Sequence, residues 1–437
     1  MIIIGQPKIF KKDGQVFLKA PIKISEDTAS AYMRLKNKMH KVHWRVDDNY
    51  PPKEWNENNF GCWFSVDEQY GAYLCSETAD AFVVAMIWYA MTTGSDIVSE
   101  APISEQMLFS INNFLIPALC TEKKGYKNIS VRGPTIKVSF TEAHGVGTGM
   151  SCGIDSFYTL WKYYNIEPKD RQLTHLAYFN MGAIFHPDSS QKTRYSLEDF
   201  YKKTDVISKE KVKNAAKVAN KSGLPLVSIS SNIDADIYRG AYGYTAVYRN
   251  CACVLALQKL FKTYYCSSAG WPDYFDLNLS EGSEHYEALL CHCFSTESCS
   301  FLLSDYVSRI EKTKSIANWE ITWDYLDVCF NFHNCGHCAK CYRTLLTLDL
   351  LGKLDNFKSV FDIEMYKRSR NKAYGWLLYA RQGDERDDNA VFARDIYNLA
   401  EEKKASIPVS SYIFMLKNAT ISFMVKVYHM IKYGMSS

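Results

Sequence analysis

A segment rich in glycine and hydroxyl side chains is the part of this sequence best suited to hold a phosphate. It covers residues 145–156 and ends in SCGIDS at residues 151–156, where a predicted strand passes into a predicted helix over 157–164. Small residues let backbone N–H groups approach a ligand, and the beginning of a helix adds about half a positive charge. The segment lacks the Gly-Lys-Ser/Thr ending of a Walker loop and is not a GxGxxG fingerprint. It predicts a phosphate cradle of another kind; the alternative is a glycine-rich turn capped by Ser151 and Asp155.

A second group of residues is suited to bind a metal. Zinc prefers four ligands in a tetrahedron with short spacers, and thiolates satisfy it without redox chemistry. Gly336 relieves crowding between the first ligands, and Lys340 and Arg343 offset the charge of a tetrathiolate. An iron–sulfur cluster is the alternative, because ferredoxins share the Cys-x2-Cys-x2-Cys spacing, and His333 or His337 would be replacement ligands. The predicted zinc ligands are Cys329, Cys335, Cys338 and Cys341.

The whole chain is that of a packed globular protein. Of its 437 residues 47% are hydrophobic, and the net charge is only +3. The whole-chain charge therefore does not point to nucleic acid as a partner, but it does not exclude one, because a local basic groove is compatible with it. The longest apolar run, residues 81–91, is too short to cross a membrane and is predicted to be a core helix. The first residues lack the pattern of a signal peptide, and the 14 cysteines are therefore expected to be thiols in the cytoplasm.

The elements that must position these groups change character near residue 140. Residues 1–140 predict an α+β accessory domain, with a strand over 15–24, a polar loop over 47–59, and helices over 78–92 and 104–119, the last capped by Ser104. Beyond it, strands alternate with helices, which favours a parallel sheet covered on both faces. The strands are expected at 176–180, 225–230 and 263–267, and the helices at 209–222 and 245–262.

Four parts are predicted in total. They are the accessory domain 1–140, an ATP-binding domain 141–328, the zinc knot 329–350 and a helical region 351–437. The last helix, over 411–433, is amphipathic and basic; packing against the core is its commoner meaning, and docking to a membrane is the alternative.

The loop at residues 151–156 resembles the Ser-Gly-Gly-x-Asp-Ser signature of the PP-loop ATP pyrophosphatases. The fold implied is α/β, with the parallel-sheet core of the HUP-like adenine nucleotide alpha hydrolases. By this resemblance Ser151 and Ser156 bind phosphate oxygens, Gly153 permits the turn, and Asp155 holds Mg²⁺ and the pyrophosphate. Cys152 departs from the signature at a glycine position, where a positive φ would be costly.

The loop and the cysteine group together resemble the QueC-like branch, related to 7-cyano-7-deazaguanine synthase. Tyr248-Arg249-Asn250 is similar to that family's Gly-Arg-Asn, and SAGWPD at 268–273 to its Ser-Gly-Tyr-Pro-Asp. The resemblance implies that Arg249 is catalytic beside Asp155 and Ser156, that Trp271 stacks on a base, and that Asp273 hydrogen-bonds its amino edge. It places the adenine of ATP near the strand that contains Phe179. For Arg249, Trp271 and Asp273 the alternative is a purely structural role, in the core or at the surface.

Arg309 and Lys312 lie three residues apart on a predicted helix. At this spacing they face one ligand together or form part of a solvated face.

The function implied is that of an ATP-dependent ligase or synthase that forms a C–N bond, with ATP, Mg²⁺ and Zn²⁺ as cofactors. A carboxylate, that of a 7-deazaguanine, attacks the α-phosphorus, and ammonia or a protein amine then attacks the adenylate. The resemblance covers residues 141–350, and the longer chain is similar to QueC-like proteins of bacterial antiphage defence systems. The alternatives are another PP-loop enzyme that modifies nucleotides or thiolates tRNA through Cys152 or Cys266, and a non-catalytic subunit of a defence complex.

Overall fold

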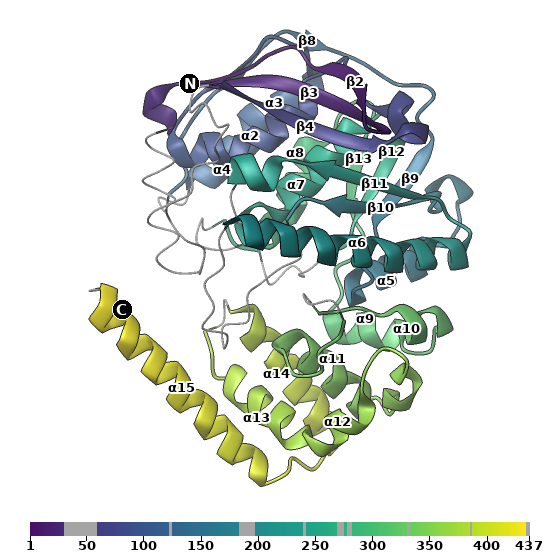
Figure 1. The fold of residues 1–437 in the computed structure, drawn as a ribbon, viewed down its shortest axis with the longest axis vertical. Coiled ribbons are helices and arrows are strands. Elements are labelled where there is room, and N and C mark those ends of the chain that lie inside the picture. The colour runs from purple at the N-terminus through teal and green to yellow at the C-terminus, as the bar shows by residue number, and fades with distance from the viewer. Residues whose placement is uncertain are drawn as a thin grey trace. The chain divides into compact units, whose positions relative to one another are not determined.

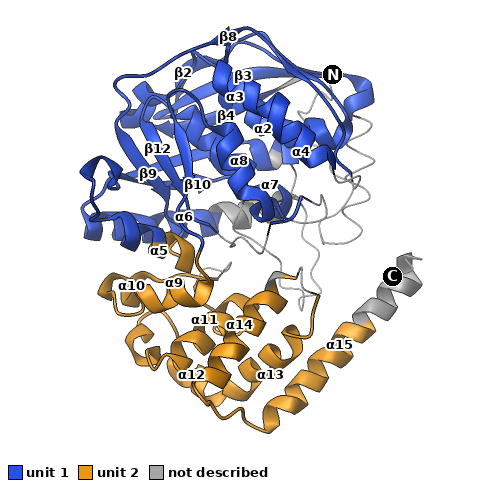
Figure 2. Cartoon of the chain, turned by 180° about the vertical axis from the view of Figure 1, so that it is seen from behind, with its two compact units in different colours: residues 1–151, 159–306 blue, residues 152–158, 307–437 orange. Residues whose placement is uncertain are grey.

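The protein is described from a computed structural model that covers residues 1–29, 59–121, 125–182, 197–238, 242–268, 275–277, 282–329, 333–384 and 387–433. The chain divides into two compact units (Figure 2). Unit 1 contains residues 1–151 and 159–306, and unit 2 contains residues 152–158 and 307–437. The polar loop predicted at 47–59 falls almost wholly outside the described residues.

Unit 1 is built on one large, mostly parallel sheet, in which five neighbouring parallel strands form one end (Figure 1). This confirms an α/β fold with a mostly parallel sheet and many helices. The strand order reverses between β9 and β12, since β10 and β11 follow on one side of β9 and β12 and β13 on the other. The parallel strands are β13 (Ser300–Leu303), β12 (Phe261–Cys266), β9 (Gly145–Gly149), β10 (His175–Asn180) and β11 (Leu226–Ser231).

The N-terminal strands extend the same sheet beyond β11. β4 (Asn59–Asp67) pairs antiparallel with β11 and with β3 (Gln15–Ile24). The alternation of buried and exposed residues in β3 confirms the strand predicted at 15–24. The boundary predicted at residue 140 therefore falls inside unit 1. The sheet is completed by β1 (Ile2–Ile4), β2 (Lys8–Lys12), β5 (Ile97–Ser99) and β7 (Val131–Arg132), and β6 (Ile103–Ser104) pairs with β8 (Thr135–Ile136) apart from it.

Helix α2 (Asp80–Thr93) is buried along its whole length, as its uniformly apolar sequence predicts. It packs on α7 (Tyr242–Ala256). Its first residue, Asp80, is fully buried and accepts hydrogen bonds from Thr78, Gln258 and the backbone of Ser104. Burial raises the pKa of Asp80 to about 6.

The helix predicted over 104–119 differs in two respects. It is divided into α3 (Glu105–Ser110), a π-helical turn (Ile111–Leu115) and α4 (Ile116–Thr121). The side chain of Ser104 does not cap it, because that hydroxyl hydrogen-bonds the carboxylate of Glu297, which also accepts from the backbone N–H of Gln106. A distant carboxylate thus replaces the local cap. Unit 1 also contains α6 (Leu197–Ser222), which packs on β10 and β11, and α8 (Glu287–Phe294).

Unit 2 is helical, and the first residues of α5 (Ile154–Tyr163) belong to it. The last helix packs on α13. Within the described ranges, no helix is both long and apolar enough to cross a bilayer. The other helices of unit 2 are α9 (Arg309–Ile316), α10 (Glu320–Tyr325), α11 (Ala339–Leu350), α12 (Ile363–Arg368), α13 (Arg370–Ala380), α14 (Asp388–Glu402) and α15 (Ser410–Tyr433).

Candidate anion-binding site and metal centre

The predicted phosphate loop lies between β9 and α5, and α5 begins three residues earlier than the sequence predicts, at Ile154. Gly145 and Gly147 are strand residues of β9. A Cβ atom on Gly147 would lie 2.5 Å from Cε1 of Phe261 on the neighbouring strand. These two glycines therefore allow close strand packing, and the loop itself is limited to residues 150–153.

Cys152 adopts the left-handed backbone conformation, with φ of 61°, and its side chain is buried. An L-residue pays roughly 1–2 kcal/mol in this conformation, which glycine adopts freely. The backbone N–H of Asp327 donates to the carbonyl oxygen of Cys152 at 2.8 Å and helps to hold the turn. The positive φ expected at the glycine position of the signature is thus present, although the residue there is a cysteine.

Asp155, in the first turn of α5, forms salt bridges with two cationic side chains of α9. Nη2 of Arg309 lies 2.6 Å from one carboxylate oxygen, and Nζ of Lys312 lies 3.4 Å from the other. The Ser308 hydroxyl accepts from the N–H of Glu311 and fixes the beginning of α9, so that both cations project from one face of the helix. The two side chains therefore face one group together, and that group is Asp155.

A third cation, Arg343 of α11, also acts on this carboxylate. Burial by itself raises the pKa of Asp155, but the charges of Arg309, Lys312 and Arg343 outweigh it and hold that pKa below its ordinary value. We call these three residues the cation cluster. Its lysine is almost fully buried, whereas the Asp155 side chain keeps 22% of its surface exposed. Three cations therefore lie around the Asp155 carboxylate in a partly enclosed site.

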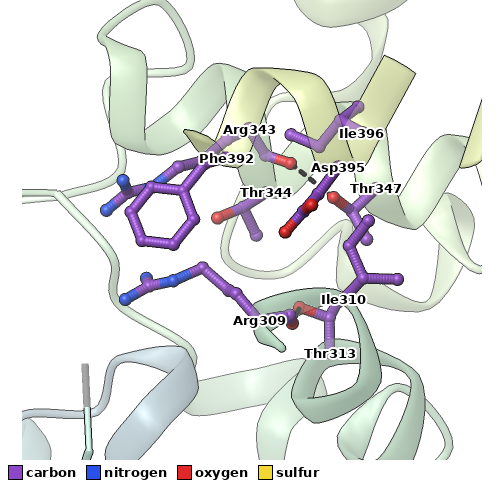
Figure 3. A pocket seen from close by; sticks show the side chains of 9 residues that line it. All are labelled: Arg309, Ile310, Thr313, Arg343, Thr344, Thr347, Phe392, Asp395 and Ile396. Carbon is purple, nitrogen blue, oxygen red and sulfur yellow. Dashed lines mark hydrogen bonds between the residues drawn. The ribbon is translucent and has the colours of Figure 1, made fainter. Parts of the chain in front are cut away.

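Phe392 of α14 lies between the two arginines of the cluster (Figure 3). Its ring centre is 4.7 Å from Cζ of Arg309 and 4.5 Å from Cζ of Arg343. Cation–π attraction of this kind offsets the repulsion between neighbouring guanidinium groups. The sequence offers no signal for this residue, and it assigned Arg343 only to the cysteine group.

The four predicted zinc ligands come together in unit 2. Their sulfur atoms all lie within 4.8 Å of one another, with Sγ–Sγ distances of 3.7 Å between Cys329 and Cys338 and 3.9 Å between Cys335 and Cys341. A tetrahedral site with Zn–S bonds of about 2.3 Å has an edge of about 3.8 Å. The cluster therefore fits a metal ion such as zinc.

The turn of this metal centre depends on Gly336. Its φ of 74° lies in the left-handed region, which brings Cys335 and Cys338 to the same side. Helix α11 begins directly after Cys338 and carries Cys341 in its first turn. The two histidines within this segment, His333 and His337, are exposed. Nδ1 of His337 hydrogen-bonds the carbonyl oxygen of Cys335 at 2.7 Å.

The other residues that the sequence predicts to contact phosphate or adenine have surroundings typical of structural residues. Ser151 is exposed, while Ser156 is buried and its hydroxyl donates to the carbonyl oxygen of Gly153 at 3.0 Å. Phe179 is half-buried in β10, with its ring 6.0 Å from that of Tyr264. The predicted base-binding residues, Trp271 and Asp273, lie outside the described residues.

Arg249 is fully buried in unit 1. Its Nη1 lies 2.5 Å from Asp234 and 2.6 Å from the carbonyl oxygen of Met181, and its Nε donates to the Thr245 hydroxyl at 2.8 Å. Within the described part of the chain, its Nη2 has no hydrogen-bond partner. Arg249 thus has the surroundings of a structural ion pair in which the Nη2 group is not used. Its predicted catalytic role stays a prediction.

Comparisons of the chain with protein-family models, with curated proteins and with solved structures found no match. Function is therefore inferred from the geometry and the sequence motifs.

Proposed function

We propose that the chain is an ATP-dependent adenylating enzyme of the PP-loop type. The cation cluster beside Asp155 is the observation that carries this proposal. Three cations lie around the Asp155 carboxylate, and a polyphosphate carries several negative charges that such a cluster would hold. The first turn of α5, which contains Asp155, adds the partial positive charge of a helix N-terminus.

The topology of the sheet supports the same ligand class. In open α/β sheets, ligands bind beyond the carboxyl ends of the strands where the strand order reverses. In unit 1 this reversal occurs at β9, and the loop that follows β9 contains the left-handed turn at Cys152. The expected position of the loop and its backbone conformation therefore agree with the proposed PP-loop.

In this proposal the cluster exchanges one anion for another. A polyphosphate competes with Asp155 for Arg309 and Lys312 and frees the carboxylate, which is a hard oxygen ligand of the kind that Mg²⁺ prefers. When a substrate carboxylate attacks the α-phosphorus, the bond to the bridging oxygen breaks and pyrophosphate leaves with additional negative charge. The cations that already surround this position stabilise that charge without reorganisation.

The acyl substrate and the amine follow from the resemblance to the QueC-like branch. We propose a carboxylate on a 7-deazaguanine as the acyl donor and ammonia or a protein amine as the acceptor, in a bacterial antiphage system. Zinc has a folding role in this proposal, because four thiolates leave no open position for a substrate.

The direct test is ATP–pyrophosphate exchange, with and without 7-carboxy-7-deazaguanine. We expect the deazaguanine to be required and Asp155→Ala to abolish the exchange. Lys312→Gln should weaken pyrophosphate binding by ~10-fold or more, measured by calorimetry, because it removes a buried charge-assisted contact. The matched control is Lys314→Gln, because Lys314 is half-exposed on the same helix and pairs with Glu311 instead.

The outcomes separate the possible conclusions. Equal loss in the Lys312 and Lys314 variants would overturn the assignment of the cluster. Pyrophosphate binding without any exchange would favour the non-catalytic subunit, for which Cys152 at a glycine position is the supporting observation.

Thiolation of a nucleotide is the second candidate, and one observation favours it. Hydrogen bonds from the thiols of Cys251 and Cys291 lower the pKa of Cys266, at the end of β12, well below its ordinary value. A thiolate is the reactive form of cysteine. If Cys266→Ser removed activity while ATP–pyrophosphate exchange continued, thiolation would replace C–N bond formation.

A further inference from the structure

Helix α15 has two apolar faces, and the described residues cover only one of them. On one side Ser411 is buried, and Phe414 and Met415 approach Gly375 of α13. On the opposite side large apolar side chains face solvent. Their exposed fractions are 69% for Ile413, 61% for Leu416 and 67% for Phe423, and Val409, in the turn directly before the helix, is 85% exposed. The interpretation of this helix as fully packed against the core is therefore incomplete.

The exposed residues follow a heptad repeat. Val409, Ile413, Leu416, Thr420 and Phe423 are separated by steps of four, three, four and three residues. The repeat continues in the sequence at Val427 and Met430. A spacing that averages 3.5 residues is the seam of a two-stranded coiled coil, in which residues at positions a and d interlock. The apolar stripe therefore has the geometry for a partner helix.

The residue types in the seam match a parallel pair. The a positions are Ile413 and Thr420, which are β-branched, and the d positions include Leu416 and Phe423. Ile or Val at a with Leu at d favours two parallel strands. We infer that α15 pairs with the α15 of a second copy of this chain as a parallel coiled coil. This inference does not depend on the proposed enzymatic function.

The charges on the flanks agree with this pairing. The sequence from 409 to 433 contains lysines and no acidic residue, so a self-pair must avoid contact between like charges. In the parallel register the g position of one helix faces the e position of the next heptad on the other. This register pairs Tyr412 with Lys417 and Ala419 with Met424, so Lys417 meets an aromatic ring.

The size of the seam also suits a protein partner. Tyr412 and Met424 add exposed fractions of 48% and 57% to the stripe. Together these side chains expose an area on the order of the ~800 Å² that each partner contributes to a standard interface. A helix that lies on a membrane turns a charged face to water. The face of α15 opposite the stripe instead packs on α13, which favours a second helix over a lipid surface.

The test is the mass of the purified full chain by light scattering at micromolar concentration. We expect a dimer of about 100 kDa, and a single chain of 50.1 kDa for the double variant Ile413→Glu, Leu416→Glu. The matched control is Ile421→Glu, because Ile421 is 45% exposed on the same helix but lies outside the seam. This variant should stay dimeric, and circular dichroism should show that all three proteins are folded.

Two outcomes would overturn the inference. One is a monomeric native chain, including one that floats with phosphatidylserine vesicles, which would assign the stripe to a membrane. The other is equal dissociation by the seam and control variants. Orientation is tested by Tyr412→Glu and Tyr412→Lys at low salt. In a parallel pair residue 412 faces Lys417 of the other copy. Tyr412→Glu should therefore tighten the association by pairing opposite charges, and Tyr412→Lys should weaken it by placing like charges together.

Discussion

Each of the two units contains an aspartate paired with an arginine, and the two pairs differ in their balance of charge. In unit 1, Arg249 and Asp234 have exposed fractions of 0% and 6% and oppose each other one to one. In unit 2, Asp155 meets Arg309 and Lys312 directly and Arg343 nearby, and keeps 22% of its surface exposed. The first pair is closed and has one cation for its carboxylate, whereas the second is partly open and has several cations around its carboxylate.

This difference separates stability from binding. A sealed, balanced pair gains nothing by opening, because each partner left alone would be an uncompensated buried charge. A cluster of several cations is a poor source of stability, since like charges repel, but in the proposed function it receives an anion. An Arg–Asp contact alone does not identify a functional site, and the local sum of charges is the more informative observation.

The largest expected effect comes from removing the metal. Helix α11 carries both Cys341 and Arg343, so a metal bound by the four cysteines would hold one member of the cation cluster in place. We expect Cys341→Ser to abolish metal binding, measured by mass spectrometry. It should destabilise unit 2 by at least ~3 kcal/mol, because metal-binding energy is folding energy in such sites. Cys120→Ser, in a half-buried thiol of unit 1, is the control. Unchanged pyrophosphate affinity in the metal-free variant would separate the metal centre from the cluster.

The two pairs themselves are compared by deleting each acid. Asp234→Ala should lower the free energy of unfolding by about 3–5 kcal/mol, because it strands the buried Arg249 guanidinium. Asp155→Ala should cost less than this, because Asp155 and Arg309 are partly exposed to water, although Lys312 is almost fully buried. It should also tighten pyrophosphate binding in the absence of Mg²⁺, because it removes the competing anion. Urea unfolding and calorimetry measure both, and similar unfolding costs would refute the distinction.

Asp80 extends the comparison to a buried acid whose observed hydrogen-bond donors are neutral. Its pKa rises from an ordinary value of 3.8 to about 6, so the folded state binds the proton more tightly than the unfolded state. The contribution of Asp80 to the free energy of unfolding is therefore highest below pH 4, falls as the pH rises towards 6, and is constant above that pH. The native chain should lose about 2–3 kcal/mol relative to Asp80→Asn between pH 4 and 7. A difference that does not change with pH would contradict this.

The smallest effect concerns the turn that precedes Asp155. Cys152→Gly and Cys152→Ala both remove the buried sulfur, but only glycine relieves the left-handed conformation. We expect the glycine variant to be more stable than the alanine variant by about 1 kcal/mol, measured by thermal unfolding. The reverse order would show that the backbone of the loop is not strained.

Local patterns in the sequence predicted an element correctly where interactions between residues close in the sequence dominate. The alternation in residues 15–24 predicts β3, and the uniformly apolar run predicts the buried helix α2. The spacing of the cysteines predicts the metal centre, because all four ligands lie within one short segment. The cap at Ser104 failed for the opposite reason, since its hydroxyl bonds Glu297, 193 residues away in the sequence.

The sequence by itself therefore determined the α/β pattern and the four clustered cysteines. Only the tertiary structure decided that Arg309 grips Asp155, 154 residues away, and that Arg249 is closed off from solvent. It also decided which face of α15 is turned outward. Helix and strand periods are set by neighbours along the chain, whereas the charge balance and the exposure of a side chain depend on residues that only folding brings together.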